Sequence, residues 1–414
     1  MNRMKISLRG NKIVEIWLFL FIWMQTITHY PLFSVGSAQS MPLHWHHLFG
    51  FFGLVMMVLF AKKIRVPVNT FTILYVYAAL LTLIGIPSNG IGSEFIKMLY
   101  AFTIYIVVYN LCESLDDGQI ERVVCAAGLL YAVLVAINML LNLSSITETL
   151  LGHIAHPDER GMITLIGGGT NIEASYLAYF SPFFLKRKKY WYWLFALVAS
   201  LAFASRVGII LCAVAMLFCL FSQTRRLTIN HLIWGIILLV AGGILLTIGY
   251  NAGLFNSIIS RFLSIGSDGG STGRLRMWNV APAIFSDHPL GCGFGNAIGL
   301  TRNYTGVNLR EGNIHNVYLQ FLLELGIPGL IMLIVVAFQT GVAALKANFQ
   351  DPKLDMLLVF FISYFIQGTG TESIVFVMVA LVHISRRKRR YELRQIAANK
   401  PPWGNALSME RPIM

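Results

Sequence analysis

The chain of 414 residues is 56% hydrophobic and only 12% charged, and its mean hydropathy is +0.66. These values exclude an ordinary soluble protein and are typical of a protein that crosses a membrane many times. The net charge of +13 is attributed to the orientation of such a protein in its membrane, and no nucleic acid is expected among its partners. Four of the five cysteines lie in or beside apolar runs, so no disulfide framework is expected.

Apolar runs of about the 20 residues that a spanning helix needs recur from one end of the chain to the other. We predict spans near 13–33, 45–61, 70–87, 94–112, 123–143, 165–185, 190–205, 207–222, 231–249, 316–345, 354–367 and 373–385. The first run follows basic residues, as in a secretion signal, but it exceeds the roughly 7 to 15 apolar residues of a signal core and is interpreted as an uncleaved span. The expected fold is an all-α, polytopic bundle of about twelve transmembrane helices, with residues 1–414 in one integral membrane domain.

The basic residues predict which way the bundle faces. With a cytoplasmic N-terminus, the inward-facing segments hold 24 of the 32 lysines and arginines, including a basic tail at 386–414. This excess agrees with the positive-inside rule, so both termini are expected in the cytoplasm. The rule works against the other eight, which are Lys97, Arg160, Arg206, Arg261, Arg274, Arg276, Arg302 and Arg310. Because arginine presents a planar fork of donors suited to phosphate or carboxylate, these outer arginines are candidates for binding an anion.

Arg206 is the least ordinary of them, because the stretch from Tyr190 to Ser222 around it is otherwise almost wholly apolar. A cation at that depth is costly unless it faces a cavity or a partner. We therefore favour an inward-facing anion site over a side chain that snorkels to the headgroups. For any single loop arginine, the alternative is that it is solvated or paired with a nearby acid.

Residues 250–315 form the longest predicted loop, which is expected to lie outside the cytoplasm. Apolar residues recur in it at helical spacing and predict a short amphipathic helix lying on the membrane: Trp278, Ala281, Ile284 and Phe285. Three alternating glycines follow, Gly291, Gly293 and Gly295. A nucleotide-binding loop needs a strand before its glycines and a helix after them, so tight backbone packing explains these glycines better.

A His-Asn pair marks the start of the next span. Asn316, Gln320 and Glu324 recur every four residues and so form one polar stripe, which a lipid-facing helix would not carry. His315 precedes the stripe at the amino end of the helix, where the dipole tends to keep an imidazole neutral. A neutral imidazole suits a general base near pH 7. Taken alone, the residue is more readily interpreted as a histidine that caps the helix or lies in the headgroup zone.

The combination favours one kind of chemistry. A candidate base and several arginines lie on the outer side, and no His/Cys/carboxylate cluster has metal-ligand spacing. Arginines can neutralise a lipid pyrophosphate leaving group without a metal, while a base deprotonates an attacking sugar hydroxyl. We therefore expect a metal-independent transferase that needs no cofactor and uses a lipid-linked sugar diphosphate.

Residues 205–329 resemble the region shared by the bacterial O-antigen ligase and O-antigen polymerase family. The matching motifs are "SRVGII" with Arg206, "STGRLRMW" with Arg274, "DHPLGCGFGN", and "HNVYLQFLLELGIPG" with His315. "GGGTNIEASYLAYF" at 167–180 is similar to an earlier Asn-rich segment of the family. Their order and spacing carry the resemblance, since no single motif is specific.

This resemblance implies a multi-pass glycosyltransferase of the bacterial inner membrane that works at the periplasmic face. It would transfer a glycan from undecaprenyl pyrophosphate to an acceptor sugar hydroxyl. His315 matches the family's proposed catalytic base, and Arg206 and Arg274 match arginines that hold the donor pyrophosphate. The weaker candidates are Arg276, Arg160, Asn316 and Glu324.

Three functions stay open from the sequence. A polymerase of O-antigen or capsule would add the growing chain to a new lipid-linked repeat unit, and it is slightly favoured because the outer loops carry little beyond the shared region. A ligase would move the finished chain onto lipid A-core with the same arginines and histidine. A polysaccharide flippase or other transporter would need no base, but no convincing internal repeat is found. Besides donor, acceptor and membrane lipids, a regulator of chain length is an expected partner.

Overall fold

The computed structural model describes residues 8–27, 32–35, 41–61, 63–89, 92–151, 169–223, 251, 259, 262, 269–306 and 314–398. Its helices are α1 (Leu8–Met24), α2 (Trp45–Phe60), α3 (Thr70–Asn89), α4 (Ser93–Leu111), η1 (Cys112–Ser114), α5 (Asp117–Leu141), α6 (Leu143–Leu150), α7 (Thr170–Lys186), α8 (Tyr190–Ala202), α9 (Arg206–Gln223), α12 (Gly269–Asn279), α13 (Ala281–Asp287), α14 (Ala297–Thr305), α15 (Val317–Lys346), α16 (Pro352–Ser363) and α17 (Ser373–Ala398). Two short strands, β1 (Phe33–Val35) and β2 (Met41–Leu43), pair antiparallel with Phe33 opposite Leu43.

The helical fold predicted from the apolar runs is confirmed. Eleven of the twelve predicted spans coincide with a described helix, and the twelfth, 231–249, lies outside the described residues. Within those residues, three helical segments are long and apolar enough to cross a membrane: Ser93–Ser114, Asp117–Leu141 and Val317–Lys346. Four other apolar helices are shorter than this, so the total of twelve spans stays a prediction.

The predicted end of the first span, residue 33, was wrong. Helix α1 ends at Met24, and the chain enters strand β1 at Phe33. Gln25 and Thr26 interrupt the apolar run, and the Thr26 hydroxyl donates to the carbonyl of Trp23 at 2.6 Å. This side-chain bond competes with continuation of the helix.

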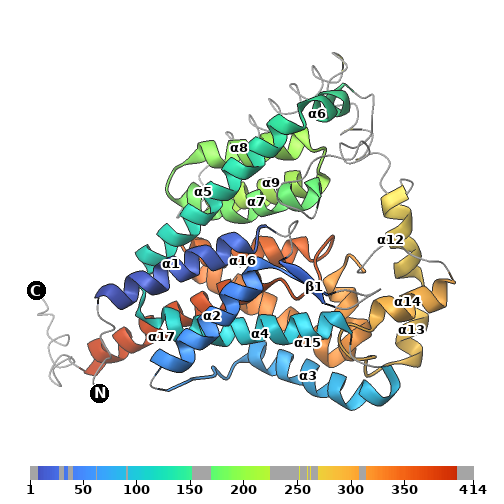
Figure 1. The fold of residues 1–414 in the computed structure, drawn as a ribbon, viewed down its shortest axis with the longest axis horizontal. Coiled ribbons are helices and arrows are strands. Elements are labelled where there is room, and N and C mark those ends of the chain that lie inside the picture. The colour runs from blue at the N-terminus through green and yellow to red at the C-terminus, as the bar shows by residue number, and fades with distance from the viewer. Residues whose placement is uncertain are drawn as a thin grey trace, which may run out of the picture.

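The helices form two groups that run mostly along the long axis of the molecule (Figure 1). Helices α5, α7, α8 and α9 lie together in the upper part of Figure 1, and α1 to α4 with α15 and α17 lie below them. Helix α16 joins the groups, because it packs against α7 and α9 as well as α15 and α17. At this junction the rings of Tyr179 and Phe360 stack with centroids 3.7 Å apart.

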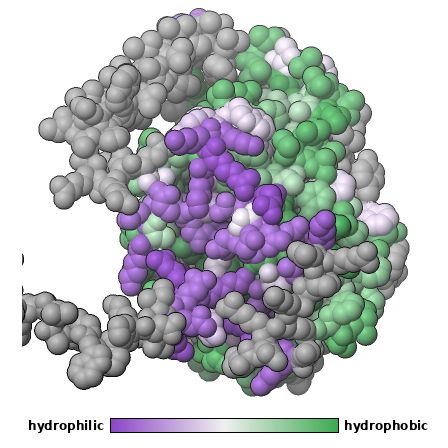
Figure 2. Space-filling view, turned by 90° about the vertical axis from the view of Figure 1, so that its left-hand side faces the viewer, coloured by the Kyte–Doolittle hydropathy of each residue, from purple (hydrophilic) through white to green (hydrophobic). Residues whose placement is uncertain are grey.

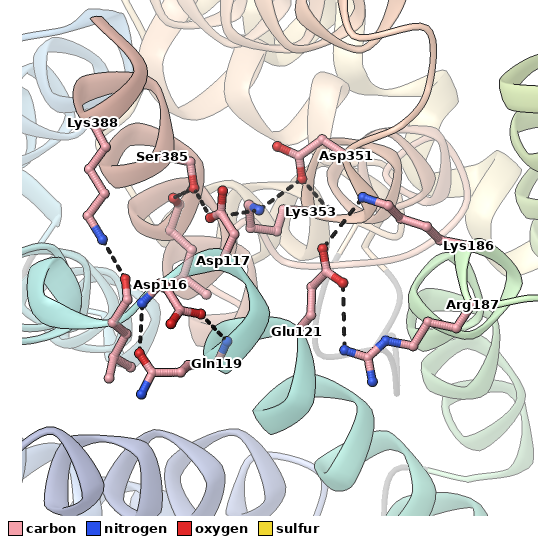
Figure 3. A network of polar contacts seen from close by, with 12 residues as sticks. Asp116, Asp117, Gln119, Glu121, Lys186, Arg187, Asp351, Lys353, Ser385 and Lys388 are labelled. Carbon is pink, nitrogen blue, oxygen red and sulfur yellow. Dashed lines mark hydrogen bonds and ion pairs between the residues drawn. The ribbon is translucent and has the colours of Figure 1, made fainter. Parts of the chain in front are cut away.

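Basic segments from distant parts of the chain meet at one end of the molecule, which we call the basic end (Arg65, Lys186, Arg187, Lys353, Arg387 and Lys388). Lys186 and Arg187 pair with Glu121 at 3.5 and 3.6 Å, and Lys353 pairs with Asp117 at 3.3 Å and Asp351 at 3.1 Å (Figure 3). Arg387 pairs with Glu113, as does Arg65. All these cations come from segments predicted to face the cytoplasm, and α12, α13 and α14 lie at the opposite end in Figure 1.

The surface agrees with a membrane protein seen end-on. Figure 2 looks onto the left-hand end of Figure 1, where hydrophilic side chains gather near the centre of the face and hydrophobic ones lie mainly above them and to their right. Large apolar side chains are exposed along the flanks, among them Leu59, Phe60, Val68, Ile84, Leu140 and Phe338. Apolar exposure on this scale is expected of a surface covered by lipid. The five cysteines are buried and free, including Cys292 in the glycine loop.

Candidate active site

The start of α15, directly after His315, is fixed by two hydrogen bonds. Asn316 is the N-cap, and its Oδ1 accepts from the Leu319 N–H at 3.0 Å. The next N–H, of Val317, donates to the carbonyl of Tyr364 at 2.9 Å. His315 itself has φ +57°, a left-handed conformation that is unfavourable for a residue with a Cβ. The surrounding bonds hold that strained backbone in place, as is common at functional sites.

Helix α12 is tied to the same segment. The indole Nε1 of Trp278 donates to the carbonyl of Ile314, next to His315, at 3.0 Å. Arg274 lies one turn before Trp278 and so on the same helical face, and it is half-buried. Arg276 is exposed and two residues further on, which turns it away from that face. The structure therefore links the helix of Arg274 to the His315 segment and separates Arg274 from Arg276.

The amphipathic segment predicted to lie on the membrane packs against protein instead. It forms two helices, α12 and α13, and the apolar face is covered by α14 and the first turns of α15. Ala281 and Ile284 belong to a buried cluster with Cys292, Ala297, Ile314 and Leu323. That prediction was wrong because periodicity shows that a face is buried but not what buries it.

The polar stripe of α15 reaches a small cavity under Ile314. The side chains of Gln320 and Glu324 are buried, and Gln320 Nε2 donates to Glu324 Oε2 at 3.2 Å. The cavity of about 10 Å³ is lined by Glu94, Gly295, Ile298, Ile314, Gln320, Glu324 and Thr369, and its size suits about one water molecule. Gln320 Oε1 is buried without a hydrogen-bond partner among the described residues, which is typical of a group that faces water or a ligand.

Sequence analysis missed the part of this site that comes from the other helices. Glu94, at the start of α4, accepts from the hydroxyl of Thr371 at 3.3 Å and from Lys97 at 2.6 Å. Glu372 follows in the loop before α17 and accepts from the hydroxyl of Tyr364 at 3.1 Å. One feature of the sequence could have indicated these residues, because Glu94 and Glu372 each lie at the predicted outer end of an apolar run.

The glycine loop packs onto the kink of α15. Gly326 is non-helical (φ 65°, ψ −169°), and Pro328 has no N–H to donate to the carbonyl of Glu324. Gly293 N donates to that carbonyl at 2.9 Å, and Cys292 N donates to the carbonyl of Leu323 at 3.0 Å. The loop thus satisfies carbonyls that the kink leaves without a helical donor.

Backbone conformation explains why this loop is made of glycines. Gly291, Gly293 and Gly295 have φ of +92°, +87° and +88°, and a Cβ on Gly291 would lie 2.4 Å from the carbonyl oxygen of Glu324. Positive φ and close backbone approach both require glycine here. This agrees with the tight packing inferred from the sequence.

Arg206 reaches the same end of the molecule on a different helix. It begins α9 after Ser205, whose Oγ accepts from the Gly208 N–H at 3.2 Å. The other end of α9 lies near the basic end, where Ser222 accepts from Gln350. Helix α9 packs against α7, α8 and α16, whereas α12 packs against α13 and α14. Arg206 and Arg274 therefore stand on separate elements, and Arg160 lies outside the described residues.

Two kinds of group in this region could take part in such a reaction. The arginines on α9 and α12 have forks suited to an anion. The carboxylates of Glu94 and Glu324 and the oxygen of Gln320 line the small cavity and can accept hydrogen bonds from hydroxyl groups. In the part of the chain that the structure describes, no group of three or more His, Cys, Asp or Glu side chains is placed to hold a metal ion.

Comparison with known proteins finds a match to one family over residues that include most of the candidate site. Residues 177–334 match the family model described as O-antigen ligase, a range that contains Arg206, Arg274, Arg276, the glycine loop, His315, Asn316 and Glu324. No curated protein matches the chain significantly. The match confirms, over residues 177–334, the resemblance to the O-antigen ligase and O-antigen polymerase family that the motifs carry.

Proposed function

We propose that the protein is a membrane glycosyltransferase that moves a glycan from undecaprenyl pyrophosphate to a sugar hydroxyl at the periplasmic face. The family supports a glycosyltransferase-like enzyme acting on lipid-linked polysaccharide. The observation that carries the proposal is the position of His315. Its neighbour Ile314 accepts a hydrogen bond from Trp278, on the helix that bears Arg274, and also lines the cavity of hydrogen-bond acceptors.

In the proposed reaction, His315 accepts the proton of the acceptor hydroxyl. The hydroxyl oxygen then forms a bond to the anomeric carbon of the donor's first sugar, while the bond between that carbon and the pyrophosphate oxygen breaks. The electron pair leaves with undecaprenyl pyrophosphate, whose charge Arg206 and Arg274 stabilise. Arg160 is a secondary candidate for the same anion, and Arg276 is a weaker one because it is turned away from the face of Arg274.

The cavity under Ile314 would orient the acceptor. It is too small for a sugar ring, so the ring would bind at its mouth and direct one hydroxyl toward Gln320, Glu324 or Glu94. Asn316 would act indirectly, by fixing the start of α15 through its bond to Leu319. No metal or cofactor is assigned a part in this step.

The proposal is tested by reconstitution of the purified protein in proteoliposomes with a lipid-linked glycan donor. An enzyme releases undecaprenyl pyrophosphate and forms a new glycosidic bond only when donor and acceptor are both present. A transporter would move the intact lipid-linked glycan across the bilayer and form no new bond, which would contradict the proposal.

Polymerase and ligase differ only in the acceptor. We retain polymerase as the proposal and ligase as the alternative; the match to the family model described as O-antigen ligase is consistent with both. Deletion of the gene separates them on a lipopolysaccharide gel, since loss of a ligase leaves bare core and loss of a polymerase leaves core with one repeat unit. If both patterns are unchanged, the product is another polysaccharide, such as capsule.

The proposed setting is the bacterial inner membrane, with the basic end in the cytoplasm and the α12 end in the periplasm. The distribution of basic segments supports this orientation. In this setting 250–315 is a periplasmic loop and 386–414 a cytoplasmic tail. A protein partner that sets chain length stays a prediction.

A further inference from the structure

A second and larger cavity, which is wide open to the surface, lies at the basic end, away from the candidate active site. It has a volume of about 540 Å³ and is formed by the link between α2 and α3, the end of α4 and the cytoplasmic part of α17. Its lining includes three cations, Lys63, Arg65 and Arg387, together with Tyr109. The size falls within the range of small-ligand sites.

The charge in this cavity is only partly balanced. Glu113 pairs with Arg387 and lies 3.6 Å from Arg65, so one carboxylate serves two arginines. Lys63 adds a third positive charge to the lining. An anion with two or more acceptor oxygens would complete the site, and phosphate matches arginine forks in geometry.

The cavity is held in shape by contacts that do not involve a ligand. Asn110 on α4 accepts from the Arg65 N–H at 2.9 Å and donates to the Arg65 carbonyl at 2.9 Å. Arg387 donates to the Tyr109 hydroxyl at 3.0 Å, and its guanidinium carbon lies 5.4 Å from the centre of the Tyr109 ring. Preorganised cations reduce the entropy lost on binding.

The neighbouring surface is apolar and exposed. Leu59 and Phe60 at the end of α2 are 70% and 60% exposed, and Val68 in the link is 88% exposed. Ile64 and Val66 line the cavity and are exposed as well. A soluble anion would leave these apolar side chains uncovered, whereas the acyl chains of a lipid would cover them.

We propose that this cavity binds the phosphate of an anionic phospholipid, with the headgroup between Lys63, Arg65 and Arg387 and the acyl chains along Leu59, Phe60 and Val68. Basic pockets between transmembrane helices are suited to such headgroups. The site would tie α2, α4 and α17 to the lipid of one leaflet. It does not depend on the reaction proposed for His315.

The test is native mass spectrometry of the full-length protein in a non-ionic detergent, titrated with phosphatidylglycerol or with phosphatidylcholine of the same acyl chains. Phosphatidylglycerol is expected to be retained in preference to phosphatidylcholine. Lys63→Gln and Arg65→Gln are each expected to weaken its binding about fivefold. Arg390→Gln is the matched control, because Arg390 is an exposed cation on the same helix as Arg387 but does not line the cavity.

Two results would overturn the proposal. If Arg390→Gln weakens phosphatidylglycerol binding as much as the other two changes, the lipid is attracted by net charge and no specific site exists. If glycerol phosphate displaces phosphatidylglycerol at equal concentration, the cavity takes soluble phosphates and the assignment to a lipid is wrong. Lys63→Gln alters an exposed side chain, so the test remains decisive if Arg65→Gln fails to fold.

Discussion

Two cations at opposite ends of the molecule have different roles: Arg206 is proposed to bind an anionic substrate, and Lys353 forms ion pairs within the protein. At the α12 end, Arg206 begins helix α9, which packs against α7 and α16. If Arg206 binds the donor pyrophosphate, its planar guanidinium can donate two parallel hydrogen bonds to the phosphate oxygens. Arg206→Lys keeps the charge and removes the fork. Transfer activity is therefore expected to fall roughly tenfold or more, through loss of one charge-assisted hydrogen bond. Activity near that of the unaltered protein would favour a snorkelling arginine instead.

At the basic end, Lys353 is a buried cation held by partly exposed acids. Its side chain is 2% exposed, against 59% for Asp117. Lys353→Met should lower the free energy of unfolding by about 1 to 3 kcal/mol, less than for a fully buried pair, because the freed carboxylates stay hydrated. Lys346→Met, at an exposed position, is the control and should change little.

The same network predicts a dependence on pH. Burial alone would lower the pKa of Lys353, but Asp351 and Asp117 outweigh it and raise the pKa above its ordinary value of 10.5. A raised pKa stabilises the fold at every pH below the unfolded value, and that contribution disappears as the pH rises through the folded value. The difference in melting temperature between the unaltered protein and Lys353→Met should therefore be constant near neutral pH and shrink above about pH 10.5. A difference that already shrinks near neutral pH would contradict this assignment.

Among the elements, the kinked helix α15 and the glycine loop form one unit. Gly291→Ala would place a methyl group 2.4 Å from the Glu324 carbonyl oxygen at a φ of +92°, so we expect a loss of stability of more than about 1 to 3 kcal/mol. Gly299→Ala, in α14 with nothing within 4 Å of the new atom, should be neutral or slightly stabilising. Unfolding midpoints in detergent compare the two variants. Equal midpoints would mean that the loop does not pack on the kink.

The sequence predicted those elements that depend on local spacing, and it missed those that depend on packing between distant segments. Apolar runs predicted helices correctly, and the four-residue spacing of Gln320 and Glu324 placed both on one buried face. Glu94 and Thr369 were missed because they reach the same cavity only through packing of α4 and the loop before α17. The apolar face around Ala281 is covered by α14 and α15, and the periodicity of a segment does not show which distant helices will cover it.

At the scale of the whole molecule, orientation can be tested with engineered cysteines. All five native cysteines are buried, so background labelling should be low. Gly299→Cys at the α12 end should react with a membrane-impermeant maleimide in spheroplasts. Tyr391→Cys, at the basic end on α17 and 42% exposed, should react only after the membrane is opened. The reverse pattern would invert the proposed topology and place the active site in the cytoplasm.

The role of His315 as a base in glycan transfer is tested most directly by the rate of transfer of the His315→Ala variant in proteoliposomes, with donor binding measured on the same sample. A positioned general base contributes about 10²- to 10⁴-fold, so we expect a loss of that size with donor binding retained. Transfer at the rate of the unaltered protein would contradict it.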